Sequence, residues 1–484
     1  MSNGKHHNST VNWIKGLAAI FVGLLVVGAT VTADESAVRN DLLENGVFVQ
    51  IPGPNPILLP GSDGAWDSHI IETADAIKDL GTYYLFYHGV GNDERYDGKG
   101  YQLGLAMSQH PLGPFKKYGD KPVLEAGPEG SWDSVHAACA MVLKEGLDRY
   151  YMWYSGYGGS EWDIGLATAD NMLGPWEKHE SNPIMKDFGY VGGVVKVKDK
   201  YFMYNEHPIG STGDDYGPMS LAVAEKPEGP WTEYVGNPVM LQGEWGEWDD
   251  GGISEAEVIY HSGVFHLFYG GSKLFSPRIA TRECIGYAYS YDGYNFTKYG
   301  LNPIVTRMAN PNAASFSEVH AIFESPFVYL YHTLRYKQQW RYGDKDRVPP
   351  GAEDIGVQVL VTQKPFRIDM PVLTLDSLAP GEKVTLNNTP PVNLSQITSL
   401  LLTAQCRYAE KAKKALRVHI VASTDGVTYD TVDLFTLDNE LVSGELVRKS
   451  FELESKAKYI KVLVENLDNK ETLEDVQIIL ILGG

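Results

Sequence analysis

A short phrase of polar and apolar residues recurs along the first three quarters of the chain. In most copies it is Asn-Pro followed by two apolar residues, and its prolines are 55 to 68 residues apart. The six copies begin at Asn55, Lys121, Asn182, Asn237, Asn302 and Met370. Self-similarity at such a period is typical of repeat architectures, so six copies predict five structural units between them.

Each predicted unit contains the same succession of short apolar runs. An aromatic run such as Tyr83–Tyr87 (YYLFY) is followed by a Gly-containing run such as Leu103–Ser108 (LGLAMS) and then by a Gly-Pro-aromatic turn. Turn residues separate four short strands in each unit, and repeated four-stranded units of this length are propeller blades. We therefore predict an all-β fold with a five-bladed β-propeller over residues 34–373. Residues Val47–Ile51 are the expected outer strand that closes the ring against the last blade.

The pattern changes after residue 373. Residues 416–437 and 458–467 alternate apolar and polar side chains at period two, and Asp425-Gly426 supplies a turn between strands. This pattern predicts a separate β-sandwich over residues 374–484. Its phrases ASTDGVTYDTV and AKYIKVLVEN resemble those of galactose-binding-like jelly rolls, which implies either a carbohydrate-binding module or a cap on the propeller.

The N-terminus resembles an export signal. Residues 1–15 carry two lysines and no acid, residues 16–31 are apolar, and Val31-Thr32-Ala33 has small residues at a cleavage site. This succession is typical of a secretory signal peptide over residues 1–33, with an uncleaved anchor as the alternative. We expect a secreted or periplasmic protein that has no membrane contact once the signal is removed.

Composition narrows the classes of partner. The chain has 484 residues, with 41 Lys and Arg against 62 Asp and Glu and a formal charge of −21. This acidic balance argues against nucleic acid and anionic membranes as partners. The 29 tyrosines and 10 tryptophans exclude a disordered chain and provide flat surfaces on which sugars can stack. We expect a monomer with a carbohydrate partner.

Acidic residues occur where the inner strand of a blade should begin, beside the mouth of the central channel. They are Glu72, Asp75, Glu255, Glu257 and Glu318. Charged side chains are rarely buried without a partner or a task. Blades 1 and 4 align without gaps, which places Asp75 opposite Glu257, and paired carboxylates on one cavity are what glycosidic cleavage requires. The alternative is that these acids cap strands or form ion pairs.

Other polar residues are expected around the same mouth as substrate contacts. They are His88, His136, His207, Glu318, His320 and Arg335. The segment around His136 (SVHAACA) is nearly repeated around His320 (EVHAIF), so the two histidines are candidates to share a metal, a water or a sugar hydroxyl. The Trp-Asp pairs at Asp67, Asp133 and Asp249 recur in three blades, and we expect them to serve the fold.

Two segments resemble the five-bladed glycoside hydrolases of family 43 and their arabinanase, β-xylosidase and invertase relatives. The segments are SEAEVIYHSGVFHLFYGG (Ser254–Gly271) and VHAIFESPFVYLYHTLR (Val319–Arg335). The resemblance implies that Glu255 is the general acid and that His320 borders the channel, where many members hold a calcium ion or its water shell. No other cofactor is expected.

The resemblance is incomplete at two positions. The family's catalytic base aligns with Thr73, which Glu72 and Asp75 flank, and its third acid aligns with Val191. In the leading hypothesis, a secreted glycoside hydrolase acts on a poly- or oligosaccharide, with Glu255 as the acid and Glu72 or Asp75 as base or nucleophile.

Two alternatives remain open. One is a phosphorylase of the family 130 type, in which Lys273, Arg278 and Arg335 would hold phosphate. The other is a glycan-binding propeller without catalysis.

Overall fold

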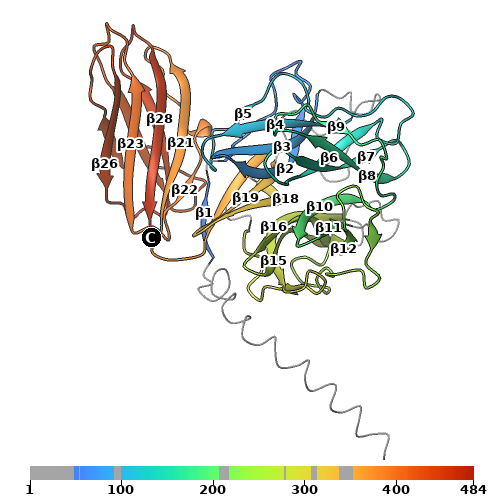
Figure 1. Ribbon diagram of the computed structural model, residues 1–484. Helices are drawn as coiled ribbons and strands as arrows, with labels where there is room; N and C mark the ends of the chain where they lie inside the picture. Colours follow the sequence, from blue (N-terminus) through green and yellow to red (C-terminus); the bar gives the residue numbers. More distant parts are fainter. Residues whose placement is uncertain are drawn as a thin grey trace, which may run out of the picture. The chain divides into compact units, whose positions relative to one another are not determined.

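The computed structural model describes residues 48–484 apart from 54, 92–99, 207–216, 277–278, 307–312, 337–350 and 352. In this described part the structure is all-β, with one 3-10 turn at Leu386–Asn388 and no α-helix, so no helix there is long and apolar enough to cross a membrane. The strands form seven four-stranded sheets, all with antiparallel pairing (Figure 1). The predicted fold class is confirmed.

Four of the sheets are consecutive stretches of the chain, and we call them blades 1 to 4. Blade 1 comprises β2 (Ile70–Asp79), β3 (Thr82–Val90), β4 (Gln102–Ser108) and β5 (Lys116–Lys117). Blade 2 comprises β6 (His136–Lys144), β7 (Tyr150–Tyr157), β8 (Trp162–Ala169) and β9 (Glu177–Lys178). Blade 3 comprises β10 (Tyr190–Val197), β11 (Lys200–Glu206), β12 (Met219–Ala224) and β13 (Thr232–Glu233). Blade 4 comprises β14 (Gly252–His261), β15 (Val264–Ser276), β16 (Ile279–Ser290) and β17 (Thr297–Lys298).

Blade 5 combines the two ends of the repeat region. It comprises β18 (Ala313–Glu324), β19 (Phe327–Tyr336), β20 (Glu353–Val361) and β1 (Val49–Pro52). Strand β1 pairs with β20 from Val49↔Val361 to Pro52↔Gln358, which confirms the predicted closure by an N-terminal strand. Residues 364–366, which follow β20, lead into β21 (Arg367–Leu378) of a different sheet.

The five inner strands form a closed ring. Each of β2, β6, β10 and β14 contacts the inner strand of the next blade, and β18 contacts β2. A repeated polar contact ties neighbouring blades, in which a second-strand tyrosine donates a hydrogen bond to an acid of the preceding blade. The pairs are Tyr150–Asp79 (2.8 Å), Tyr201–Glu145 (2.8 Å) and, across the closure, Tyr83–Glu324 (2.7 Å). The predicted propeller therefore closes between blades 5 and 1 with the same chemistry as elsewhere.

The Asn-Pro phrase completes the blade that precedes it. The Asn182 side chain accepts a hydrogen bond from the Leu166 N–H and donates one to the Leu166 carbonyl, both at 2.9 Å. Asn55 binds Val357 of blade 5 in the same way. The sixth copy, Met370–Leu373, lies inside β21 of a different sheet, so the boundary that we placed at residue 373 falls within a strand.

The Trp-Asp pairs hold blades 1, 2 and 4 together, as expected. Asp133 is buried and accepts hydrogen bonds from the Tyr154 hydroxyl (3.1 Å) and the Lys178 ammonium (2.5 Å). Trp132 packs on Tyr154 of the same blade, with ring centroids 5.5 Å apart. A Cβ at Gly165 would lie 2.6 Å from the Tyr154 ring, so the glycine of the third strand leaves room for this packing.

The remaining two sheets belong to the C-terminal residues. One comprises β21 (Arg367–Leu378), β28 (Leu473–Gly483), β23 (Ser399–Arg407) and β26 (Leu446–Leu453). The other comprises β22 (Val392–Asn393), β27 (Tyr459–Asn466), β24 (Leu416–Ser423) and β25 (Phe435–Asp438).

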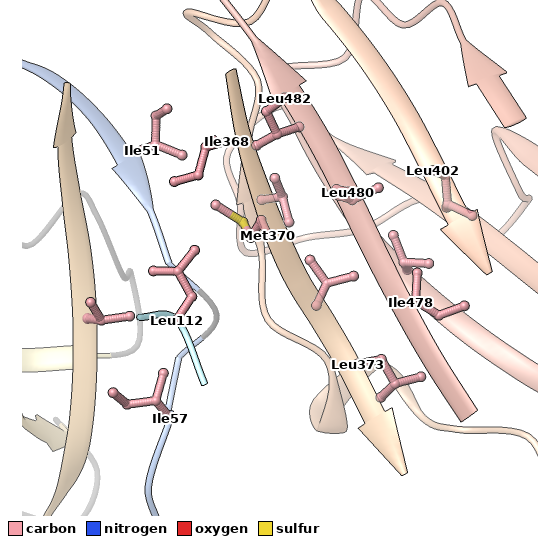
Figure 2. Close-up of a cluster of buried hydrophobic side chains, with 14 of the residues drawn as sticks. Ile51, Ile57, Leu112, Ile368, Met370, Leu373, Leu402, Ile478, Leu480 and Leu482 are labelled. Carbon is pink, nitrogen blue, oxygen red and sulfur yellow. The ribbon is translucent and has the colours of Figure 1, made fainter. Parts of the chain in front are cut away.

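Buried apolar residues of both sheets share one core, drawn in part in Figure 2. The same core includes Ile51 of β1 and, from connecting segments of the propeller, Ile57 and Leu112. Asp425-Gly426 does form a turn, but β24 ends before it and the next strand starts only at Phe435.

Candidate active site

Each inner strand has a β-bulge or related irregularity near its start. The register shifts occur at Glu72/Ala74, Ala138/Met141, Val191/Val194, Ile253/Ala256 and Ser317/His320. A bulge re-aims the side chains next to it. In β2 the extra residue Thr73 leaves Glu72 opposite His88 and Asp75 opposite Phe86, so both acids lie on one face of the strand.

Glu72 and Glu318 share one arginine, and with His88 and Thr333 they form a group that we call the arginine cluster. Arg335, which is 5% exposed, donates a hydrogen bond to Glu318 (Nη2–Oε1 3.0 Å) and lies 3.6 Å from Glu72 Oε1. His88 Nε2 lies 3.2 Å from Glu72 Oε2, and the Thr333 hydroxyl donates to Glu318 Oε2 at 2.6 Å. A guanidinium beside two buried carboxylates favours their charged form.

Asp75, Glu257 and His320 form a second group, the acid–histidine cluster. They come from the inner strands of blades 1, 4 and 5, which are neighbours in the ring. Each lies opposite an aromatic residue of its second strand. His320 Nδ1 is 3.2 Å from Glu257 Oε2 and 3.8 Å from Asp75 Oδ1. The Val142 N–H donates to Asp75 Oδ2 at 2.6 Å.

Burial determines the protonation of this cluster. It raises the pKa of Glu257 to about 8. Burial, reinforced by the nearby Glu257 charge, raises the pKa of Asp75 to about 7. Burial lowers the pKa of His320 to about 4. At neutral pH Glu257 therefore carries a proton and the imidazole is neutral, and His320 Nε2 has no hydrogen-bond partner among the described residues.

The same three side chains also present a possible set of metal ligands, since one ligand atom from each lies within 4.8 Å of the others. Calcium prefers about six to eight oxygen ligands, whereas a set of two carboxylates and an imidazole suits zinc or similar ions better. The described residues thus do not fit a calcium ion bound directly by His320.

Most of the predicted site residues meet in these two adjoining clusters. The sequence predicted Glu72, Asp75, Glu257, Glu318, His88, His320 and Arg335. Thr333 was not predicted. It directly follows an aromatic run, and nothing in the sequence distinguishes its hydroxyl from that of any other threonine. Glu255 lies in the bulge of β14 and is described through its backbone alone. His207 lies outside the described residues.

His136 belongs to a third group. Its Nδ1 accepts a hydrogen bond from the Tyr101 N–H at 3.0 Å, and its ring stacks on Trp162. Tyr101 and Trp162 were not predicted as site residues, although each stands at the edge of a predicted strand. The expectation that His136 and His320 share one ligand remains a prediction.

Fold and site together define a β-propeller in which buried or half-buried carboxyl groups from several blades cluster on the inner strands. No family model matches the chain. One curated relative, described as a 1,2-beta-oligomannan phosphorylase from Thermoanaerobacter sp. (strain X514), is 28% identical over 128 residues. The match covers 25% of this chain and 41% of that protein.

Two solved structures resemble the chain over about two thirds of its length. A putative glycoside hydrolase from Parabacteroides distasonis ATCC 8503 has 14% identity and a TM-score of 0.49, covering 67% of this chain and 99% of that one. A structure described with the words "The GH130 family of mannoside phosphorylases contains glycoside hydrolases that target beta-1,2 mannosidic linkages in Candida mannan" has 17% identity and a TM-score of 0.48, covering 66% and 96%. The fold assignment itself rests on the sheet topology above.

Proposed function

We propose that this chain is a carbohydrate-active enzyme that cleaves glycosidic bonds at the mouth of its propeller channel. One observation carries the proposal: carboxyl groups from blades 1, 4 and 5 adjoin at the inner strands in unlike surroundings, some beside Arg335 and some beside His320. Glu72 lies beside a guanidinium, which favours the ionised form, while burial keeps Glu257 protonated at neutral pH. Glycosidic cleavage needs one carboxylic acid to protonate the leaving oxygen and one carboxylate to activate the nucleophile or to attack.

The roles follow from these environments. Glu72 acts as the base or nucleophile. The proton donor is an acid of β14, and Glu257 is the candidate with a described environment. Its neighbours are Asp75 and His320, and His320 Nδ1 lies 3.2 Å from its carboxyl group. Glu255, in the bulge two residues earlier, is the donor that the family resemblance suggests, and single variants separate the two.

The proposed substrate is an oligosaccharide, and β-1,2-linked mannosides are the first class to test. The name of the curated relative supports this choice. It also supports a second candidate reaction, in which inorganic phosphate replaces water as the acceptor and a sugar 1-phosphate is released. Arg335 is a cation at the mouth that phosphate would meet, although two carboxylates already surround it.

The test incubates the purified chain from residue 34 onward with β-1,2-mannobiose and with a panel of xylo-, arabino- and manno-oligosaccharides, with and without phosphate. Reducing sugar and sugar 1-phosphate are measured separately, which distinguishes hydrolysis from phosphorolysis. Glu72→Gln should lower kcat by about 100-fold or more. One of Glu257→Gln and Glu255→Gln, whichever removes the proton donor, should lower it by a similar factor. The matched control is Glu233→Gln, an exposed acid on β13.

Three results bear on the proposal. Full activity of Glu72→Gln would rule out Glu72 as base or nucleophile. Loss in Glu255→Gln with full activity in Glu257→Gln would transfer the acid role to Glu255. A wild type that binds sugars of the panel and cleaves none of them would be a glycan-binding propeller.

A further inference from the structure

A row of aromatic rings crosses blades 1 to 3 beside the arginine cluster. Its members are Tyr101, His136, Tyr157, Trp162 and Tyr190. His136 and Trp162 stack with centroids 5.4 Å apart and planes 18° from parallel. On one side the ring centroids of Tyr101 and His136 are 5.3 Å apart. On the other side those of Trp162 and Tyr190 are 4.6 Å apart. Each ring touches the next, so the row is continuous.

The row begins at the proposed catalytic carboxylates. His88 packs edge-on against Tyr101 at 4.5 Å, and its Nε2 lies 3.2 Å from Glu72. One buried histidine therefore connects the row to the group that we assign as base or nucleophile. If one sugar unit of an oligosaccharide lies over Glu72, the adjacent sugar units extend either along this row or away from it.

The five rings of the row are partly exposed. Second-strand rings such as Tyr87, Trp153 and Tyr154 are fully buried and fill the space within and between sheets. The members of the row instead stand at strand ends: His136 opens β6, Trp162 opens β8 and Tyr190 opens β10. Their positions expose them at one edge of the sheets, although apolar packing alone would favour deeper burial.

We infer that this row is a ledge that binds the sugars next to the bond that is cleaved, and that the substrate is an oligosaccharide of at least three units. One face of a pyranose ring carries C–H groups and packs on a flat aromatic ring, while its hydroxyls stay at the edge within reach of water. The hydrogen bond from the Tyr101 N–H fixes the plane of His136 against Trp162, so the ledge is rigid before a sugar arrives. This inference rests on the proposed function, because Glu72 defines the reacting end.

The test compares short and long substrates on the full chain. Wild type, Trp162→Ala and Trp162→Leu are assayed on β-1,2-mannobiose and β-1,2-mannotetraose, or on the biose and tetraose of whichever panel sugar is cleaved. Trp162→Leu keeps apolar volume but removes the flat ring. The control is Trp245→Ala, which removes a 77% exposed tryptophan on the loop before β14.

We expect both Trp162 variants to lower kcat/KM on the tetraose by about 10- to 100-fold, chiefly through KM, with less than about a threefold change on the biose. The control should match wild type on both substrates. Equal losses on biose and tetraose, or unchanged tetraose kinetics, would overturn the ledge while leaving the cleavage reaction intact.

A wild type that cleaves nothing would instead refute the proposed function. The ledge would then be tested by calorimetric titration with the tetraoses of the panel. Binding by wild type that is lost in Trp162→Leu would support the ledge, and no binding by wild type would refute it.

Discussion

Replacement of Glu257 by Gln should stabilise the protein at alkaline pH and leave it unchanged in acid. Glu257→Gln keeps the shape and can still hydrogen-bond His320, but it removes the titrating group. The carboxyl group has a pKa of about 8 in the folded chain against an ordinary value of 4.5. Between these values the folded chain keeps a proton that the unfolded chain has lost, so the free energy of unfolding falls as pH rises.

The size of the effect follows from the pKa shift. Each unit corresponds to about 1.4 kcal/mol, so the ionisable Glu257 side chain costs the fold about 4 kcal/mol at pH 8 and nothing near pH 4. The groups that face it are Asp75, whose pKa is raised to about 7, and His320, whose pKa is lowered to about 4, with Glu318 and His88 beside them. Asp75 adds a slope of the same sign, which the Glu257 variant retains.

The assay is thermal unfolding of wild type, Glu257→Gln and the exposed control Glu233→Gln from pH 5 to pH 9. Glu257→Gln should raise Tm by about 5 °C at pH 8 and by little at pH 5. A variant that is less stable than wild type at pH 8 would refute the reasoning, because the carboxyl group would then be ionised in the fold. If EDTA abolished that deficit, a bound cation would be the cause.

Three further predictions follow from other parts of the chain. Arg335→Met leaves two buried carboxylates without their shared cation and should cost about 3–5 kcal/mol in urea unfolding, whereas a loss below 1 kcal/mol would contradict a buried ion pair. Gly165→Ala places a Cβ 2.6 Å from a tyrosine ring and should cost about 1–3 kcal/mol, while Gly300→Ala, with open space around it, should be neutral. Expression in a secreting bacterial host should yield a mature N-terminus at Asp34 by mass spectrometry, and an intact chain in the membrane fraction would contradict the predicted cleavage.

The repeat phrase was sufficient to predict the blades but not their limits. Asn182 and Asn302 bind the main chain of the third strand through their amides, which makes the phrase a structural marker. Met370 copies the apolar part of the phrase without an amide, and its strand pairs with β28 instead. Sequence similarity alone could not distinguish the blade-completing copies from the copy at Met370, because they differ in which main chain each phrase binds.

The inner-strand acids were predictable as a set, but their grouping was not. Simple alternation along β2 puts Glu72 and Asp75 on opposite faces, and the bulge at Thr73 reverses this. In β18 the bulge holds Glu318 at φ +54°, a conformation that costs a non-glycine residue roughly 1–2 kcal/mol.

That conformation places the Glu318 carboxylate against Arg335 and Thr333, whose hydrogen bonds offset part of the cost. The irregularity recurs in all five inner strands, and Cys139 in the bulge of β6 has a similar φ of +52°, so the departure from regular strand geometry belongs to these strands as a group. The same displacement, which simple period-two alternation does not anticipate, brings Glu72 and Asp75 onto one face of β2.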